Sequence, residues 1–340
     1  MPQPRGRIAS PGAFFDSYFS TIDSALAVSL LYGLQGKNEC RLAIISMSRP
    51  NLAVAGFADT VQRFYHGPAA TFAQLPPIGM STNGAPGETP AAFVAPFQKK
   101  QADGTPVYKN QVRSVIDTGD PCTLIRNYLE AQADQTALFV LAGPATNLAA
   151  ALAFPGLADL IAAKVKHLVV AGGAFPAGPP EAHVKADIAA AKKVFAEWPT
   201  PIVASGAEVG SALEFPGASI EKQFAEAMPD NPVADAYRAW QPMPYDAPSW
   251  AMTAALYAAR PKEDYFTLSG PGMIDVDRDG RTSFTASEKG NHRYLIVDPA
   301  QKEKITLAYV ELASAKPQAP RRFGPPVVPP PDVTTPPLKK

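Results

Sequence analysis

Two aspartates bracket a turn near the start of the chain, in FFDSYFSTIDSALA (residues 14–27). Asp16 ends a short apolar stretch typical of a buried strand, and Asp23 begins the apolar helical pattern that follows. Ligands of parallel sheets bind at the carboxyl edge, so two acids there could hold a hard cation through oxygen atoms. An ordinary structural role is the alternative, with Asp23 as a helix N-cap and Asp16 as a turn residue.

The segment DVDRDG (275–280) matches the first half of a calcium-binding EF-hand loop. That loop needs a bidentate glutamate at its twelfth position, where this chain has Ala286. The flanking residues are strand-like, so a hairpin turn with Asp-Gly at its tip explains the motif.

A glycine-rich segment, AGGAFPAGPP (171–180), follows an apolar strand pattern. It lacks the Lys-Ser/Thr pair of a P-loop and the spacing of a dinucleotide-binding loop. We expect its glycines to let the chain turn tightly at the carboxyl edge of the sheet.

The segment LAGPATNLAAAL (141–152) places Thr146 and Asn147 at a predicted helix start. Helix capping explains both residues without a function. A free backbone carbonyl at such a turn is also a possible metal ligand.

Strand and helix patterns alternate along most of the chain, which is typical of a mostly parallel sheet covered by helices. We expect strands at 12–16, 41–47 and 136–142, and helices at 22–36 and 122–134. Residues 68–121 are rich in Pro, Gly and Thr and give no clear pattern. Beyond about residue 210 the pattern is helical, and 265–287 predicts a small β-hairpin before a last strand and helix.

Composition limits the class of protein. The 340 residues carry 31 basic and 31 acidic side chains, a net charge of zero, which argues against broad binding to nucleic acid or an anionic membrane. A hydrophobic content of 46% supports a real core. Cys40 and Cys122 form no CxxC motif, so we expect neither a zinc site nor a disulfide scaffold. The most apolar region, 136–163, is interrupted by polar residues and prolines, so we expect no transmembrane helix.

We expect three parts: a loose lead (1–11), one α/β domain (12–315) and a Pro-rich tail (316–340) with polyproline-II character. The N-terminus shows no apolar segment of a signal peptide, which predicts a cytoplasmic protein by default. Export stays possible if the printed N-terminus is truncated.

Five segments together resemble the inosine-uridine-preferring nucleoside hydrolase family in order and spacing, over about residues 12–315. They are FFDSYFSTIDSALA, VLAGPATNLAAAL, HLVVAGGAF, PEAHVKADIAAAKKVFAEWPTPIV and SWAMTAALYAARP. The resemblance implies a single α/β domain with a central, mostly parallel sheet flanked by helices. It also implies hydrolysis of the bond between ribose and base, with calcium holding the water and the ribose hydroxyls.

The resemblance assigns calcium ligands to the first turn, which reads DxDxxxDD in the family. Asp16 and Asp23 match two of these acids, whereas the other two fall on Tyr18 and Ser24. The backbone carbonyl ligand of the family would come from Ala142. Calcium takes six to eight oxygens, several of them carboxylates, so we expect weak calcium binding or none.

Another family ligand, an aspartate in the C-terminal helix, falls on Ala251. Asp246 lies five residues earlier, in MPYDAPSW, and could partly replace it. A turn acid before Pro248 is the simpler interpretation of Asp246.

The resemblance also assigns substrate contacts. The ribose-binding EFN segment is EAH here, which keeps Glu181 and puts His183 in place of the asparagine. A histidine that protonates the leaving base in some members becomes Trp250. With Asn147, these residues are the predicted contacts for a nucleoside or a ribose-like molecule.

Three hypotheses follow. The preferred one is a nucleoside-hydrolase-like protein that keeps a ribose-sized pocket while calcium-dependent catalysis is weak or lost. The second is an active hydrolase with an altered centre that uses Asp16, Asp23 and possibly Asp246. The third is an interaction protein that acts through its Pro-rich tail. Because the family commonly forms dimers or tetramers, a homo-oligomer is also possible.

Overall fold

The computed structural model describes residues 10–67, 70–71 and 74–317. Its main sheet runs in the order β11-β10-β12-β6-β5-β4-β1-β2-β3, and β9 pairs with β12. The parallel strands are β1 (Gly12–Ser17), β2 (Arg41–Met47), β3 (Ile78–Met80), β4 (Ala137–Ala142), β5 (Val165–Ala171), β6 (Ile202–Ser205) and β12 (His292–Ile296). The antiparallel strands β9 (Thr267–Leu268), β10 (Gly272–Val276) and β11 (Thr282–Ala286) extend one end.

Helices cover both faces of the sheet, and side chains of the strands alternate between two cores. In β1, Phe15 packs in the core beneath one set of helices and Phe14 in the core beneath the other. The first set comprises α1 (Ile22–Gly36), α2 (Leu52–His66), α3 (Ala91–Gln98), α9 (Ala207–Ala212), α11 (Pro232–Trp240), α12 (Trp250–Ala259) and α13 (Lys302–Ala313). The second comprises α4 (Pro121–Glu130), α5 (Thr146–Ala153), α6 (Leu157–Lys164) and α8 (Ile188–Glu197).

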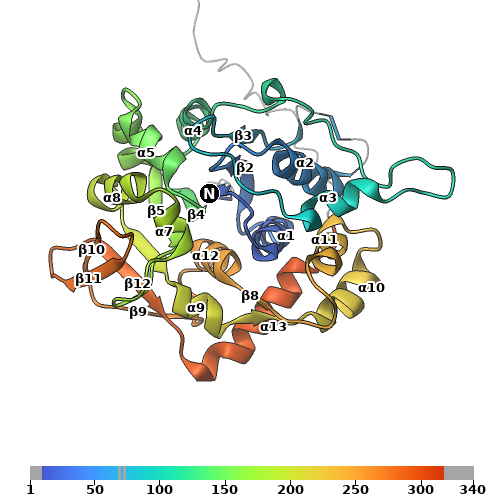
Figure 1. Ribbon diagram of the computed structural model, residues 1–340. Coiled ribbons are helices and arrows are strands. Elements are labelled where there is room, and N and C mark those ends of the chain that lie inside the picture. Colours follow the sequence, from blue (N-terminus) through green and yellow to red (C-terminus); the bar gives the residue numbers. More distant parts are fainter. Residues whose placement is uncertain (1–9, 68–69, 72–73, 318–340) are drawn as a thin grey trace, which may run out of the picture.

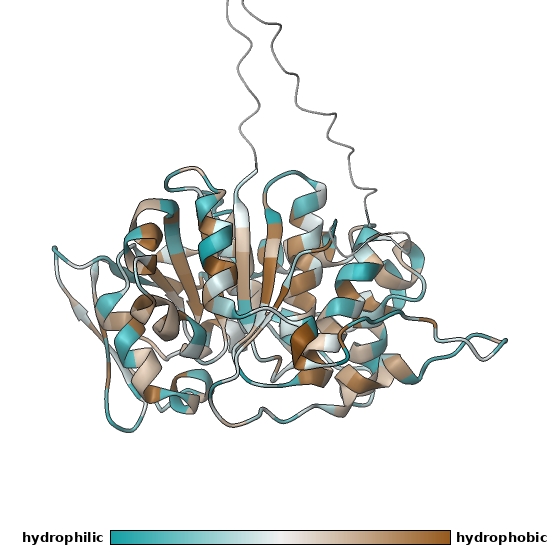
Figure 2. Ribbon diagram, turned by 90° about the horizontal axis from the view of Figure 1, so that it is seen from above, coloured by the Kyte–Doolittle hydropathy of each residue, from teal (hydrophilic) through white to brown (hydrophobic). Residues whose placement is uncertain are grey.

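This architecture confirms the predicted single α/β domain with a central, mostly parallel sheet flanked by helices (Figure 1). Strands buried on both faces read as continuous apolar runs, as RLAIISM does in β2. Figure 2 shows these hydrophobic strands in the interior, with hydrophilic residues on the helices around them.

Shorter elements lie between and beside these. They are α7 (Ala182–Ala186), β7 (Glu214–Phe215), α10 (Ala225–Ala227), β8 (Ala247–Pro248) and the helical turns η2 (Val115–Asp117), η3 (Ile220–Phe224) and η4 (Pro299–Gln301). Strands β7 and β8 form a separate antiparallel pair.

The predicted hairpin at 265–287 is present, but it continues the main sheet because β10 pairs with β12. The region 68–121, which has no clear sequence pattern, supplies β3 and α3, and the chain after α3 projects from the body (Figure 1). The tail from residue 318 and the lead up to residue 9 lie outside the described residues.

Among the described residues, no single helix has the length and apolar character needed to cross a bilayer. The helices Thr146–Ala153 and Leu157–Lys164 have this length and apolar character only when they are taken together, and a bend of 110° lies between them.

A close helix crossing makes Gly33 a sensitive position. A Cβ added at Gly33 of α1 would lie 2.0 Å from the backbone oxygen of Leu312 in α13. We expect Gly33→Ala to lower the free energy of unfolding by about 1–3 kcal/mol, although alanine is the better helix former. Urea unfolding measures the change. Gly270→Ala is the control, because nothing lies within 4 Å of its Cβ position; an equal effect of both changes would contradict the argument.

Candidate functional site

Two predicted site residues, Asp16 and Ala142, lie at the carboxyl ends of the neighbouring strands β1 and β4. Ser17 at the end of β1 lies beside Ala142 at the end of β4, and Ala171 of β5 lies beside Ser205 of β6. The turns that follow these strands therefore face one edge of the sheet.

Asp16 is fully buried beneath this edge. Its Oδ2 accepts a hydrogen bond of 2.9 Å from Nδ2 of Asn147, and its Oδ1 has no partner among the described residues. Burial raises the pKa of the Asp16 carboxyl to about 8, and the hydrogen bond from Asn147 opposes this rise. Burial therefore favours the neutral form of this carboxyl.

Asn147 also donates to Oγ of Ser46 and to the backbone oxygen of Met47, each at 3.1 Å. Its amide thus ties α5 to β1 and β2. The predicted capping role of Asn147 is wrong, because its side chain bonds to the sheet and makes no cap hydrogen bond in α5.

Asp23 caps a helix distant in sequence. Its two oxygens accept hydrogen bonds from the backbone amides of Ala251, at 2.5 Å, and Met252, at 3.1 Å, in the first turn of α12. Burial raises the pKa of Asp23 to about 7, against the effect of these bonds. The predicted N-cap role in its own helix is wrong, because Thr21 occupies that position.

Tyr18 and Ser24, the positions of the missing family acids, have local partners. The Tyr18 ring lies edge-on to the ring of His183, with centroids 5.6 Å apart, and lies beside Gly87. Tyr18 therefore spans from α7 to the segment after β3. Oγ of Ser24 lies 3.0 Å from Oγ of Ser17, where Ser17 donates to it.

Glu181 and His183 belong to the start of α7. The Glu181 carboxylate accepts hydrogen bonds from the backbone amides of His183, Val184 and Gly173, at 3.0–3.2 Å. Nδ1 of His183 lies 2.9 Å from the backbone oxygen of Ala171, and Nε2 lies 3.5 Å from Oγ of Ser20. With Nδ1–H donating to the carbonyl, Nε2 is left as an acceptor.

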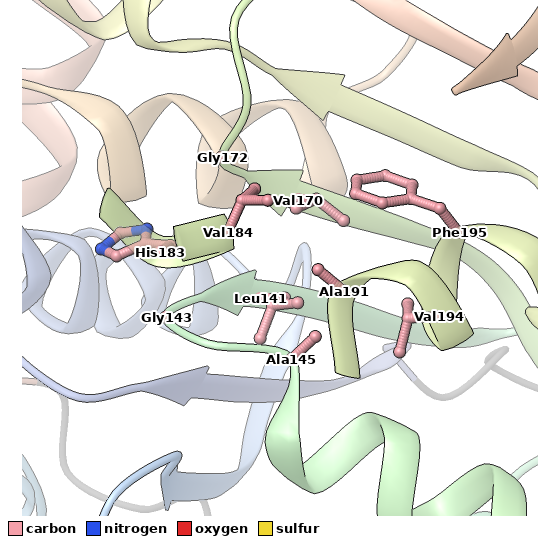
Figure 3. Close-up of a pocket in the computed structure, with 10 residues that line it drawn as sticks. All are labelled: Leu141, Gly143, Ala145, Val170, Gly172, His183, Val184, Ala191, Val194 and Phe195. Atoms are coloured by element: carbon pink, nitrogen blue, oxygen red, sulfur yellow. The ribbon is translucent and has the colours of Figure 1, made fainter. Parts of the chain in front are cut away.

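His183 borders a narrow apolar cavity between β4, β5 and α8 (Figure 3). Leu141, Val170, Ala191 and Phe195 contribute to its walls, and its volume is about 10 Å³. A space of that size holds about one water molecule, so it cannot take a ribose.

A larger cavity, of about 180 Å³, opens between the start of α1 and the segment before α12. Three predicted site residues line it: Asp23, Asp246 and Trp250. Asp16, Ala142 and His183 are not among its lining residues, so the structure does not bring all the predicted residues into one cavity.

Asp246 and Trp250 are held by backbone partners. Oδ1 of Asp246 accepts a hydrogen bond of 2.8 Å from the amide of Gly217. Nε1 of Trp250 donates to the backbone oxygen of Ala207 at 3.0 Å. Trp240 and Tyr245 also line this cavity, and sequence reasoning missed both; the aromatic spacing over 240–250 was the available signal.

Within the described residues, no group of three or more His, Cys, Asp or Glu side chains is arranged to hold a metal ion. The DVDRDG segment forms the predicted hairpin turn, where the Asp277 carboxylate accepts hydrogen bonds from the amides of Asp279 and Arg281 at 2.8 Å.

Comparison with known proteins rests on structure. No protein-family model and no curated protein sequence matches the chain. A plant nucleoside hydrolase, PpNRh1, superposes with a TM-score of 0.66 at 20% identity, over 90% of this chain and 99% of the other. An inosine-uridine preferring nucleoside hydrolase from Bacillus anthracis gives 0.63 at 17% identity, over 90% and 99%. The type III effector XopQ, solved with adenosine diphosphate ribose, gives 0.58 at 13% identity, over 92% and 94%.

These similarities establish that the chain has a nucleoside-hydrolase-like fold, as its sequence resemblance implies. At identities of 13–20%, these similarities show the fold alone, and an activity has to be inferred from the residues of the site.

Proposed function

We propose that this protein with the nucleoside-hydrolase-like fold binds a small polar molecule of about the size of a ribose and has weak or lost calcium-dependent hydrolysis. The observation that carries the proposal is the environment of Asp23. Both oxygens of this acid are taken by backbone amides of α12. An acid used in this way has lost much of its capacity to hold a cation.

The other donors do not fit calcium. Asp16 offers one free oxygen, on a carboxyl whose raised pKa favours the neutral form at pH 7. Tyr18, Ser24 and Ala251 supply no carboxylate. Calcium needs six to eight oxygens, and each charged contact contributes roughly 1.5–3 kcal/mol. Three missing carboxylates therefore correspond to a loss of several orders of magnitude in affinity.

The cavity that contains Asp23, Asp246 and Trp250 is the best candidate for the small-molecule site. Its volume of about 180 Å³ is below the roughly 300–1,000 Å³ typical of sites for drug-sized ligands, and suits a single ring or a branched fragment.

An active hydrolase with an altered centre is the second candidate, because Asp23 and Asp246 line one cavity. In that case one of the two carboxylates would act as general base for water. The third hypothesis, an interaction through the Pro-rich tail, falls on residues outside the described part of the chain and rests on composition.

Calcium titration tests the proposal. We expect calorimetry to detect no calcium binding below millimolar concentration. We also expect no release of base from inosine or uridine, and no release of nitrophenol from nitrophenyl riboside. Free ribose, inosine and adenosine diphosphate ribose complete the ligand panel. Micromolar calcium binding, or base release that a chelator abolishes, would reject the proposal in favour of an active enzyme.

Restoring the family residues provides a gain-of-function prediction. We expect the combined variant Tyr18→Asp, Ser24→Asp, Ala251→Asp and His183→Asn to bind calcium at least a hundredfold more tightly than the parent, since three carboxylates are added. The matched control carries Asn at all four positions and should gain nothing. Should the Asp variant fold but bind no better than the Asn control, the assignment of these four positions is wrong.

A further inference from the structure

Three aromatic side chains contribute to the walls of the 180 Å³ cavity. Trp240 ends α11, Trp250 begins α12, and Tyr245 lies in the segment between them; all three line the cavity. Two of the three tryptophans in the chain therefore border this one cavity.

Contacts with neighbouring residues hold these rings in place. The Tyr245 ring stacks on Tyr237, with centroids 4.3 Å apart and planes 7° apart, and its hydroxyl donates to the Tyr237 backbone oxygen at 2.6 Å. The Trp250 indole N–H is bonded to Ala207, and the Trp240 ring packs against Phe93 with centroids 5.9 Å apart. The polar hydrogens of Tyr245 and Trp250 are therefore already bonded to backbone oxygens, which leaves the ring carbons of these lining residues for a ligand.

Carboxyl groups supply the ionisable side chains of the same walls. Asp23 and Asp246 line the cavity, and none of its ten described lining residues is Lys, Arg or His. Asp246 is solvent-exposed, and its Oδ2 accepts no hydrogen bond from the described residues. The positive end of α12 is offset by Asp23, which accepts its first amide hydrogens.

We propose that this cavity binds a small organic ammonium ion, with Trp240, Tyr245 and Trp250 around the alkylated nitrogen and Asp246 as its counter-ion. Cations bind the faces of aromatic rings, and quaternary ammonium groups suit such cages because little water must be removed from them. A phosphate, by contrast, would face two carboxyl groups. The inference rests on the proposed function in one respect, which is that both place the ligand in this cavity.

Choline and its uncharged carbon isostere, 3,3-dimethylbutan-1-ol, form a matched pair of probes. We expect choline to change the tryptophan fluorescence of the full chain. We also expect it to bind at least tenfold more tightly than the isostere, because the two compounds have the same shape and only choline carries a positive charge. Calorimetry of the same pair gives the two affinities directly. Equal binding of the two compounds, or tighter binding of ribose, inosine or adenosine diphosphate ribose than of choline, overturns the inference.

Two variants localise the effect. Asp246→Asn keeps an acceptor for Gly217 and should weaken choline binding roughly tenfold without changing the affinity for the isostere. Trp240→Leu should weaken both. Glu226→Gln removes the same charge from the exposed surface outside the cavity and should leave binding unchanged. An unchanged choline affinity in folded Asp246→Asn would refute the site.

The outcomes also separate this inference from the proposed function. Failure of choline to bind, with calcium binding and base release absent as well, removes the ammonium site and leaves the loss of hydrolysis standing. Calcium-dependent base release removes the proposed function, whichever probe enters the cavity.

Discussion

Asp23→Ala is expected to lower the free energy of unfolding by about 2–5 kcal/mol. The substitution leaves the amides of Ala251 and Met252 without their acceptor in a region where Asp23 is 1% exposed. Each buried donor left unsatisfied costs roughly 1–3 kcal/mol. Urea unfolding followed by circular dichroism gives the change as a lower midpoint at an unchanged m-value.

Two substitutions control this measurement. Asp23→Asn keeps one acceptor oxygen and should cause a clearly smaller loss. Asp159→Ala removes an exposed acid from the first turn of α6 and should cost less than about 1 kcal/mol. A loss of less than about 1 kcal/mol for Asp23→Ala would mean that the carboxyl does not cap α12 in solution, which would free it for a ligand or a metal.

The second large effect concerns Asp16 and pH. Burial raises the pKa of this carboxyl from 3.8 to about 8 in the folded protein, whereas the unfolded chain loses the proton near pH 4. Between these values the unfolded state binds fewer protons, so the stability of the parent protein falls as pH rises from about 4 to 8. Each pKa unit corresponds to about 1.4 kcal/mol, which makes the total a few kcal/mol.

Asp16→Asn replaces the ionisable carboxyl by a neutral amide. The variant should therefore be more stable than the parent, and its advantage in the free energy of unfolding should grow from pH 4 to pH 8. Unfolding is measured at several pH values, and the quantity of interest is the difference between variant and parent. The difference is needed because other groups also make stability depend on pH. Burial lowers the pKa of His167 to about 4, so this residue makes the parent more stable as pH rises from about 4 to 6.5. Burial of Asp23 adds a slope in the same direction as Asp16, up to about pH 7.

Asp159→Asn, at an exposed position, serves as the control and should show no such pH-dependent gain. A difference between Asp16→Asn and the parent that stays flat across this range would show that Asp16 is ionised in the folded protein. An ionised Asp16 would favour a bound cation and would weaken the proposed loss of the calcium site.

The fold follows from local patterns in the sequence. Helix α1 and strand β2 occupy the ranges 22–36 and 41–47 that apolar periodicity predicts. Alternation of such elements favours a parallel sheet, because consecutive strands joined by a helix lie in the same direction. The region 68–121 escaped prediction because β3 is three residues long and α3 contains Pro96.

The residues of the candidate site were predicted only in part. Sequence reasoning placed Asp23, Asp246 and Trp250 near a site, and the structure puts these three in one cavity. It missed Trp240 and Tyr245, whose positions depend on how the segment between α11 and α12 folds back on the start of α1. It also placed Asp16 and His183 in the same pocket, whereas these residues lie outside the lining of that cavity.

Outside residues 68–121, the sequence by itself therefore determined the alternation of strands and helices, and it determined the residue types available at the sheet edge, since both depend on neighbours within a few positions. The tertiary structure alone decided what each acid does. Asp23 meets α12 across 228 positions of sequence, and Asp16 meets Asn147 across 131. Whether a carboxyl is free, bonded or neutral depends on the groups packed around it, and those groups come from distant parts of the chain.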